Sequence, residues 1–201
     1  MIILLIMRCI SMKNDFPNIT ENLVLNFCNT KILKQGKLVD LFNTIDSFKL
    51  WLEIPIDKNE DYNRQLSVMY SCLDTSLNIE DVKQLREELS KIFTRVINDA
   101  DTIDDVKSEI ESFIGSSPFT LIFVDNDPLM IPVEKGIIGI KTILFLSLVS
   151  LIQSDELKKL AKCANEECPL FFINQSGRRK WCSMKLCGNR NKVEKFLNKT
   201  K

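Results

Sequence analysis

Residues 163–190 read CANEECPLFFINQSGRRKWCSMKLCGNR and hold four of the seven cysteines of this 201-residue chain. Their spacing is C-x4-C-x13-C-x4-C, and the four are Cys163, Cys168, Cys182 and Cys187. A step of five residues turns about 140° net around a helix, so neither pair can lie on one helical face. Each pair must instead bend around a common point, as the ligands of a tetrahedral zinc ion do. The spacing therefore predicts one structural Zn²⁺ bound by four thiolates.

Other uses of four cysteines stay open at this point. Four thiolates also suit an iron–sulfur cluster, and disulfides or simple core packing are further alternatives. A four-ligand zinc site has no open position, so the metal is not expected to be catalytic. The chain contains no histidine, which excludes His-based acid–base catalysis and Ser–His or Cys–His nucleophile pairs. We expect a protein that is not an enzyme.

The segments around the cysteines predict a small zinc unit. Residues 170–181 (LFFINQSGRRKW) predict a strand, a turn at residues 175–177 and a second strand, and residues 189–199 predict a terminal helix. A hairpin flanked by ligand turns and followed by a helix is a treble-clef-like unit. Such a unit has too small a core to fold alone, so metal binding would supply most of its stability.

The chain before the cysteines predicts a mainly helical body. Apolar residues recur at helical spacing after capping signals, and a short apolar pattern around turn residues predicts a β-hairpin. Helices are expected at 19–35, 44–53, 60–75, 78–97, 102–115, 137–152 and 154–163, and the hairpin at 119–133. The predicted fold is α+β and mainly helical, with a helical body over 1–157 that carries a small hairpin, and the zinc unit over 158–201.

Two apolar runs raise the question of a membrane. The run at 2–7 is too short to span a bilayer and predicts a first strand, and the run at 137–152 contains Lys141 and is better suited to a buried helix. An odd number of cysteines and no secretion signal favour a reducing compartment. We expect a cytoplasmic protein without a membrane partner.

Charge is unevenly distributed along the chain. Residues 1–160 carry 17 Lys and Arg against 24 Asp and Glu, whereas residues 161–201 carry 10 against 3. The formal charges are −7 and +7, although the whole chain is neutral. A basic tail on an acidic body indicates an anionic partner such as nucleic acid, or an attraction between the two parts.

The basic residues near the cysteines are candidates for contact with nucleic acid. Phosphate contacts of this kind give salt-dependent affinity, and Asn or Arg side chains can read base edges from a helix in the major groove. Some of the arginines could instead offset the negative charge of the thiolates. The candidates are Arg178, Arg179, Lys180, Lys185, Asn189, Arg190, Lys192, Lys195 and Lys199, of which the last three form one stripe on the predicted terminal helix.

The stretch 163–193 closely resembles the CGNR zinc finger, which is named for the tetrapeptide found here at residues 187–190. The shared positions include the four cysteines, Phe171-Phe172, residues 177–179 and residues 181–184. Upstream, LVLNFCNT (23–30) and LREELSKIF (85–93) resemble the ABATE domain of bacterial stress-induced transcription regulators, although Asn26 stands where that family more often has Asp. The resemblance implies a DNA-binding finger on a domain that senses a small-molecule effector or forms a homodimer.

Asn29 and Thr30 match the most recognisable pair of the ABATE domain. They could line a ligand pocket, but a polar pair that caps or breaks a helix is the commoner explanation. The alternative function for the whole chain is a zinc-stapled protein-interaction module, whose basic surface docks an acidic protein partner.

Overall fold

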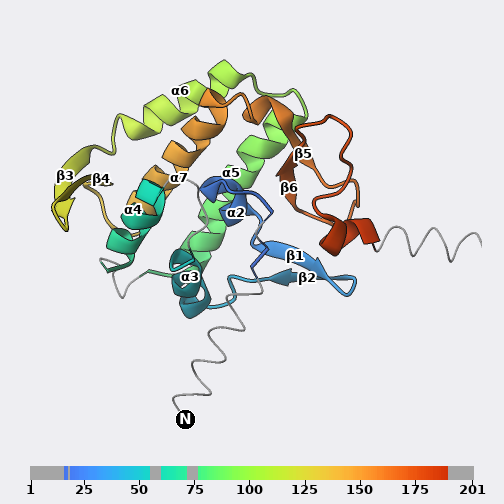
Figure 1. Cartoon of the computed structure of the whole chain (residues 1–201), viewed down its shortest axis with the longest axis horizontal. Helices are drawn as coiled ribbons and strands as arrows, with labels where there is room; N and C mark the ends of the chain where they lie inside the picture. The colour runs from blue at the N-terminus through green and yellow to red at the C-terminus, as the bar shows by residue number, and fades with distance from the viewer. Residues whose placement is uncertain (1–15, 18, 55–59, 72–76, 190–201) are drawn as a thin grey trace, which may run out of the picture.

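The computed structural model of the chain describes residues 16–17, 19–54, 60–71 and 77–189 (Figure 1). The α-helices are α2 (Leu23–Cys28), α3 (Ile45–Leu52), α4 (Glu60–Ser71), α5 (Ile79–Ile97), α6 (Ile103–Ile114) and α7 (Gly136–Gln153). Three antiparallel hairpins pair β1 (Lys31–Lys34) with β2 (Lys37–Asp40), β3 (Phe119–Val124) with β4 (Asp127–Pro132), and β5 (Leu160–Lys162) with β6 (Phe171–Ile173). Two short helical turns are η1 (Leu157–Lys159) and η2 (Met184–Gly188). The predicted α+β, mainly helical class is confirmed.

Helix α7 forms the centre of the body and packs against α2, α4, α5 and α6. By length and composition alone this 18-residue helix could cross a membrane. In this fold it is the core helix instead, with Ile140, Ile143, Leu144 and Leu148 fully buried among the other helices. Burial against neighbours on several sides explains why its sequence shows so little amphipathic pattern.

The helices that the sequence marks with capping residues begin where those residues predict. Asn78 caps α5 by accepting a hydrogen bond from the Glu80 amide. Thr102 and Asp105 form a reciprocal capping box at the start of α6, in which each side chain accepts a hydrogen bond from the amide of the other. The predictions for 78–97 and 102–115 are therefore confirmed, as is the hairpin predicted at 119–133.

The helix predicted over 19–35 is observed only at Leu23–Cys28, and the prediction is wrong for the residues on either side. Helix α2 ends at Cys28, and the chain then forms the hairpin β1–β2. Gln35 and Gly36 both have positive φ, 53° and 76°, and make the tight turn of this hairpin. Gly36 thus belongs to the turn of a hairpin, directly after the range 19–35 in which a helix was predicted.

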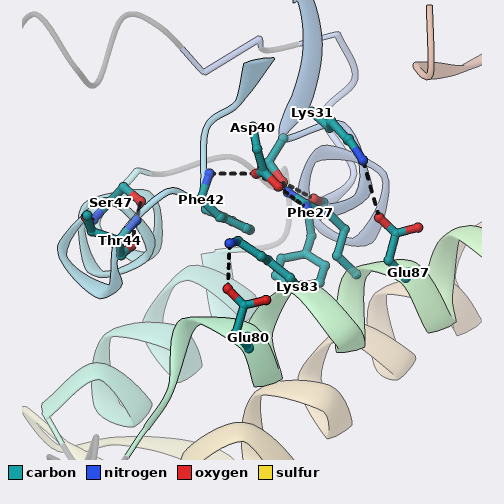
Figure 2. A network of polar contacts seen from close by, with 11 residues as sticks. Phe27, Lys31, Asp40, Phe42, Thr44, Ser47, Glu80, Lys83 and Glu87 are labelled. Atoms are coloured by element: carbon teal, nitrogen blue, oxygen red, sulfur yellow. Dashed lines mark hydrogen bonds and ion pairs between the residues drawn. The ribbon is translucent and has the colours of Figure 1, made fainter. Parts of the chain in front are cut away.

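An ion pair between buried Arg86 and half-buried Asp40 fixes this hairpin to α5. Arg86 is only 2% exposed, and its two terminal nitrogens donate to the two carboxylate oxygens of Asp40 at 2.6 and 2.5 Å. Figure 2 shows Asp40 beside Phe42, whose amide donates to the same carboxylate at 3.0 Å. Burial alone would raise the pKa of Asp40, but the hydrogen bonds and charge of Arg86 outweigh it and hold that pKa below its usual range.

Candidate metal centre

The four predicted cysteine ligands come together in one buried cluster. Their Sγ atoms all lie within 4.8 Å of one another, and the Sγ atoms of Cys168 and Cys182 are 3.9 Å apart. Four sulfurs at zinc–sulfur bond length around one tetrahedral ion lie about 3.8 Å apart. The cage therefore has the size of a single zinc site. An iron–sulfur cluster places several metal and sulfide atoms between its cysteines and needs a wider cage.

The electrostatics of the cluster also fit a cation. Hydrogen bonds from the Cys168 and Cys182 thiols lower the pKa of Cys163 well below its usual range. The hydrogen bond to Cys163 raises the pKa of Cys168 and also that of Cys182. Burial raises the pKa of Cys187. Without a metal, one of the four thiols loses its proton readily and the others keep theirs. A divalent cation among them would stabilise all four thiolates. These residues can bind one zinc ion.

The finger is built on the hairpin β5–β6, which differs from the predicted arrangement. The segment 154–163 forms η1 and then strand β5 where a helix was expected, and residues 178–181 form no second strand beside β6. Strand β6 pairs with β5 instead, so that the first cysteine turn, from Cys163 to Cys168, closes this hairpin. The amide of Cys163 donates to the Leu170 carbonyl at 3.0 Å, which continues the pairing up to the ligands.

Each cysteine pair sits on a hydrogen-bonded turn. In the first turn, the side-chain oxygen of Asn165 accepts a hydrogen bond from the Glu167 amide at 3.1 Å. The backbone carbonyl of Asn165 accepts one from the Cys168 amide at 2.8 Å. In the second, the Ser183 hydroxyl accepts from the Leu186 amide at 3.0 Å and caps η2. The backbone amide of Cys182 also points at Cys163 Sγ at 3.5 Å. Amide donors of this kind stabilise a thiolate ligand and orient it.

Arg179 holds the second pair in place. Its guanidinium lies over the Phe172 ring, 4.5 Å from the centroid, and Nε donates to the Trp181 carbonyl at 2.8 Å. A terminal nitrogen donates to the carbonyl of the ligand Cys182. The side chain of Asn174 exchanges two further hydrogen bonds with the Arg179 backbone. Arg179 thus closes the loop that carries the second cysteine pair.

The other predicted nucleic-acid contacts fall into two groups. Arg178, Lys180, Lys185 and Asn189 are exposed, and within the described ranges the side chains of the three cations have no hydrogen-bond or ion-pair partner. The backbone of Asn189 ends η2 by donating to the Met184 carbonyl. The remaining candidates, Arg190, Lys192, Lys195 and Lys199, lie outside the described residues, as do the predicted terminal helix and the predicted strand at 2–7.

Asn29 and Thr30 are both buried and bind other parts of the protein. The Asn29 amide donates to the Phe171 carbonyl at 3.0 Å and accepts from the Phe171 amide at 2.8 Å. Thr30 donates to the Phe27 carbonyl at 2.8 Å and accepts from Arg86 at 3.1 Å. Both residues therefore serve the fold, and Asn29 joins α2 to the strand that follows the first cysteine turn.

The body and the finger share apolar packing. Phe171 meets Phe93 of α5 edge to face, with ring centroids 5.5 Å apart, and both Phe171 and Leu160 belong to the main core. The body also contributes to the core of the finger, because Ile32 of β1 packs into the cluster that contains the four cysteines. The sequence pattern did not reveal these contacts, because each joins segments far apart in the chain.

Comparison with known proteins bears on the C-terminal part of the chain. No curated protein matches the sequence. Residues 159–199 match the CGNR zinc finger family, and the matched residues include all four clustered cysteines. The likeness of residues 1–157 to the ABATE domain stays a prediction. The match and the buried four-cysteine cage together identify the C-terminal segment of this chain as a CGNR zinc finger.

Proposed function

We propose that this protein binds DNA through its CGNR zinc finger and regulates transcription. The observation that carries the proposal is the set of exposed cations Arg178, Lys180 and Lys185 on a rigid, metal-stapled scaffold, none of which has a partner within the described ranges. Cations without intramolecular partners are available for phosphate contacts. Arg179 is different, since its guanidinium is already bound to the ligand loop.

The zinc has a structural role in this proposal. With all four positions filled by thiolates, the ion fixes the two cysteine turns and takes no part in chemistry. The cysteine turns then hold residues 178–185 in one conformation, so that their cations meet a phosphate backbone without a further entropic cost of ordering. The finger contributes most of the affinity through charge, which makes that affinity strongly salt-dependent.

For the body we propose a regulatory role, as a sensor of a small effector or as a dimerising domain in the cytoplasm. One cavity of about 290 Å³ lies between α3 and α4 and is lined by Leu52, Glu53, Ile54, Asn63, Ser67 and Tyr70. A second, of about 260 Å³, lies beside Lys141 and Glu88. Asn29 and Thr30 line neither cavity, so an effector site is better sought between these helices than at the predicted pair.

The test measures the binding of zinc-loaded protein to a short mixed-sequence DNA duplex, with fluorescence anisotropy as the readout, across a series of salt concentrations. We expect log affinity to fall linearly with log salt concentration, and binding to be lost in Cys182→Ser. No binding at low salt would refute the proposal. Binding of an acidic polypeptide in place of the duplex would favour the protein-interaction module.

A further inference from the structure

Hairpin β3–β4 presents an apolar face to solvent. Leu121 is 52% exposed, Phe123 is 69% exposed and Met130 is 49% exposed. The register sets Leu121 opposite Met130 and Phe123 opposite Pro128, so these side chains share one face of the hairpin. The other face packs into the main core, where Leu129 is buried. Three large apolar side chains exposed to this degree cover on the order of 300 Å², which is in the range of patches that mark interaction sites.

The outer edge of β4 is closed to a further strand. The Val133 amide donates to the Pro118 carbonyl at 2.9 Å, which makes these two residues a hydrogen-bonded pair. Hydrogen-bonded and non-hydrogen-bonded pairs alternate along an antiparallel ladder. The positions of β4 whose backbone groups face away from β3 are therefore Pro128, Met130 and Pro132. The two prolines have no amide hydrogen to donate, and the Met130 carbonyl already accepts a hydrogen bond from Gln65 of α4.

The outer edge of β3 is open. By the same alternation its outward positions are Phe119, Leu121 and Phe123, and among the described residues none of their amides donates to another element. The strand FTLIFV (119–124) contains neither a charged residue nor a proline, the two devices that usually keep an edge strand from pairing. Strand β4 packs against α4 and α7. Figure 1 shows β3 outside β4, at the end of the molecule opposite the finger.

This edge is complementary to a second copy of itself. The sequence FTLIF (119–123) has a phenylalanine on each side of Leu121 at the same spacing. Antiparallel pairing about a two-fold axis at Leu121 sets this residue opposite its own copy and Phe119 opposite the partner's Phe123. These outward positions exchange both backbone hydrogen bonds, and the aromatic side chains meet across the strands on the exposed face. The acidic turns at residues 125–127 then lie at opposite ends of the paired strands, so they do not repel each other.

We propose that β3 pairs with β3 of a second copy of this chain and forms a homodimer with one continuous sheet, in the order β4–β3–β3–β4. The inference rests on the dimerising role proposed for the body and does not depend on DNA binding by the finger. A specific interface buries about 800 Å² on each partner. The apolar patch supplies only part of that area, so the dimer is weak and dissociates in the micromolar range. The two fingers then lie at the outer ends of the dimer, because each is opposite β3 in its own protomer (Figure 1).

The test is sedimentation equilibrium of the full, zinc-loaded chain across about 1–300 μM, where a weak dimer forms and dissociates. Wild type is expected to pass from the monomer mass to the dimer mass. Leu121→Lys should raise the dissociation constant roughly tenfold or more, because it sets two like charges opposite each other at the two-fold axis and removes two apolar contacts. The matched control is Leu38→Lys, which makes the same change at a leucine of β2 that is 56% exposed. It should dimerise as wild type does.

Amide hydrogen exchange of wild type, read by NMR at low and high concentration, tests the pairing without any substitution. The outward amides of Phe119, Leu121 and Phe123 should gain protection in the dimer, whereas those of Thr120 and Ile122, already bonded to β4, should be protected in both states. A chain that stays monomeric, or a dimer without added protection at the three outward amides, would overturn the proposal. Neither result affects duplex binding by the finger, and a failure of duplex binding leaves the dimer in place. Zinc content and thermal midpoint confirm that each variant is folded.

Discussion

Replacing Asn29 with alanine is expected to loosen the finger from the body. Asn29 is fully buried at the end of α2, and its amide forms both available hydrogen bonds with the backbone of Phe171, at 3.0 and 2.8 Å. Alanine can make neither bond. The substitution leaves one carbonyl and one amide of strand β6 buried without their partner.

The size of the effect follows from those two groups. A buried donor or acceptor left unsatisfied costs about 1–3 kcal/mol, so the variant should lose roughly 3 kcal/mol of unfolding free energy. For a chain of this length each kcal/mol lowers the melting temperature by about 2–4 °C, which gives a decrease of about 6–12 °C. Because β6 leads away from Cys168, the variant should also release zinc more readily to a chelator.

The assay is thermal and urea unfolding of the zinc-loaded variant, with chelator competition for zinc. Asn98→Ala is the matched control, because Asn98 also follows the last turn of a helix but is exposed, and within the described residues its side chain has no partner. The control should cost less than about 0.5 kcal/mol. If Asn29→Ala unfolds like the control and retains zinc as wild type does, Asn29 does not join the two parts.

Three further predictions concern the metal and the ion pair between Arg86 and Asp40. Cys182→Ser should abolish stoichiometric zinc binding in metal analysis, whereas Cys28→Ala should retain one ion per chain; an unchanged metal content in the first would refute the ligand assignment. Arg179→Met should lower zinc affinity about 10–100-fold in chelator competition, because it removes the group that holds the ligand loop; a loss of DNA binding alone would contradict this role. Asp40→Asn should lower unfolding free energy by about 3 kcal/mol at neutral pH, because Arg86 is left buried without its counter-charge. In the folded protein the pKa of Asp40 is lowered from 3.8, so the stabilising contribution of its carboxylate is complete above pH 3.8 and is lost as the pH falls through the lower folded value. The unfolding free energies of wild type and Asp40→Asn, measured in urea, should therefore converge in acid. A difference that stays constant with pH would argue against the ion pair.

Local patterns in the sequence were sufficient for several parts of the structure. Thr102 and Asp105 locate the start of α6 because a capping box involves only neighbouring residues. The hairpin β3–β4 was predictable because its turn residues, Asp125 and Asn126, accept positive φ. The metal ligands could be recognised because two cysteine pairs with the same short spacing are typical of a zinc site.

Features that depend on distant contacts could not be found in this way. The strands of β1–β2 have four residues each, too few for a periodic pattern to distinguish them from a continued helix. Strand β6 pairs with β5 across the first cysteine turn, whereas the sequence pattern predicted the downstream segment 178–181 as its partner and a helix in place of β5. The role of Asn29 depends on Phe171, which is 142 residues away, and no local signal at residue 29 indicates that partner.

The same 142-residue separation has a consequence for the order of events during synthesis. Asn29 leaves the ribosome 142 residues before Phe171 of its partner strand. Until then the Asn29 amide and the Phe93 ring have no strand to cover them, although the helices that carry them are already complete. A nascent chain in that state exposes a polar group and an aromatic surface that attract chaperones or promote aggregation. Its yield in the cell should therefore depend on how quickly the finger folds once it has been synthesised, and so on the zinc supply at that time.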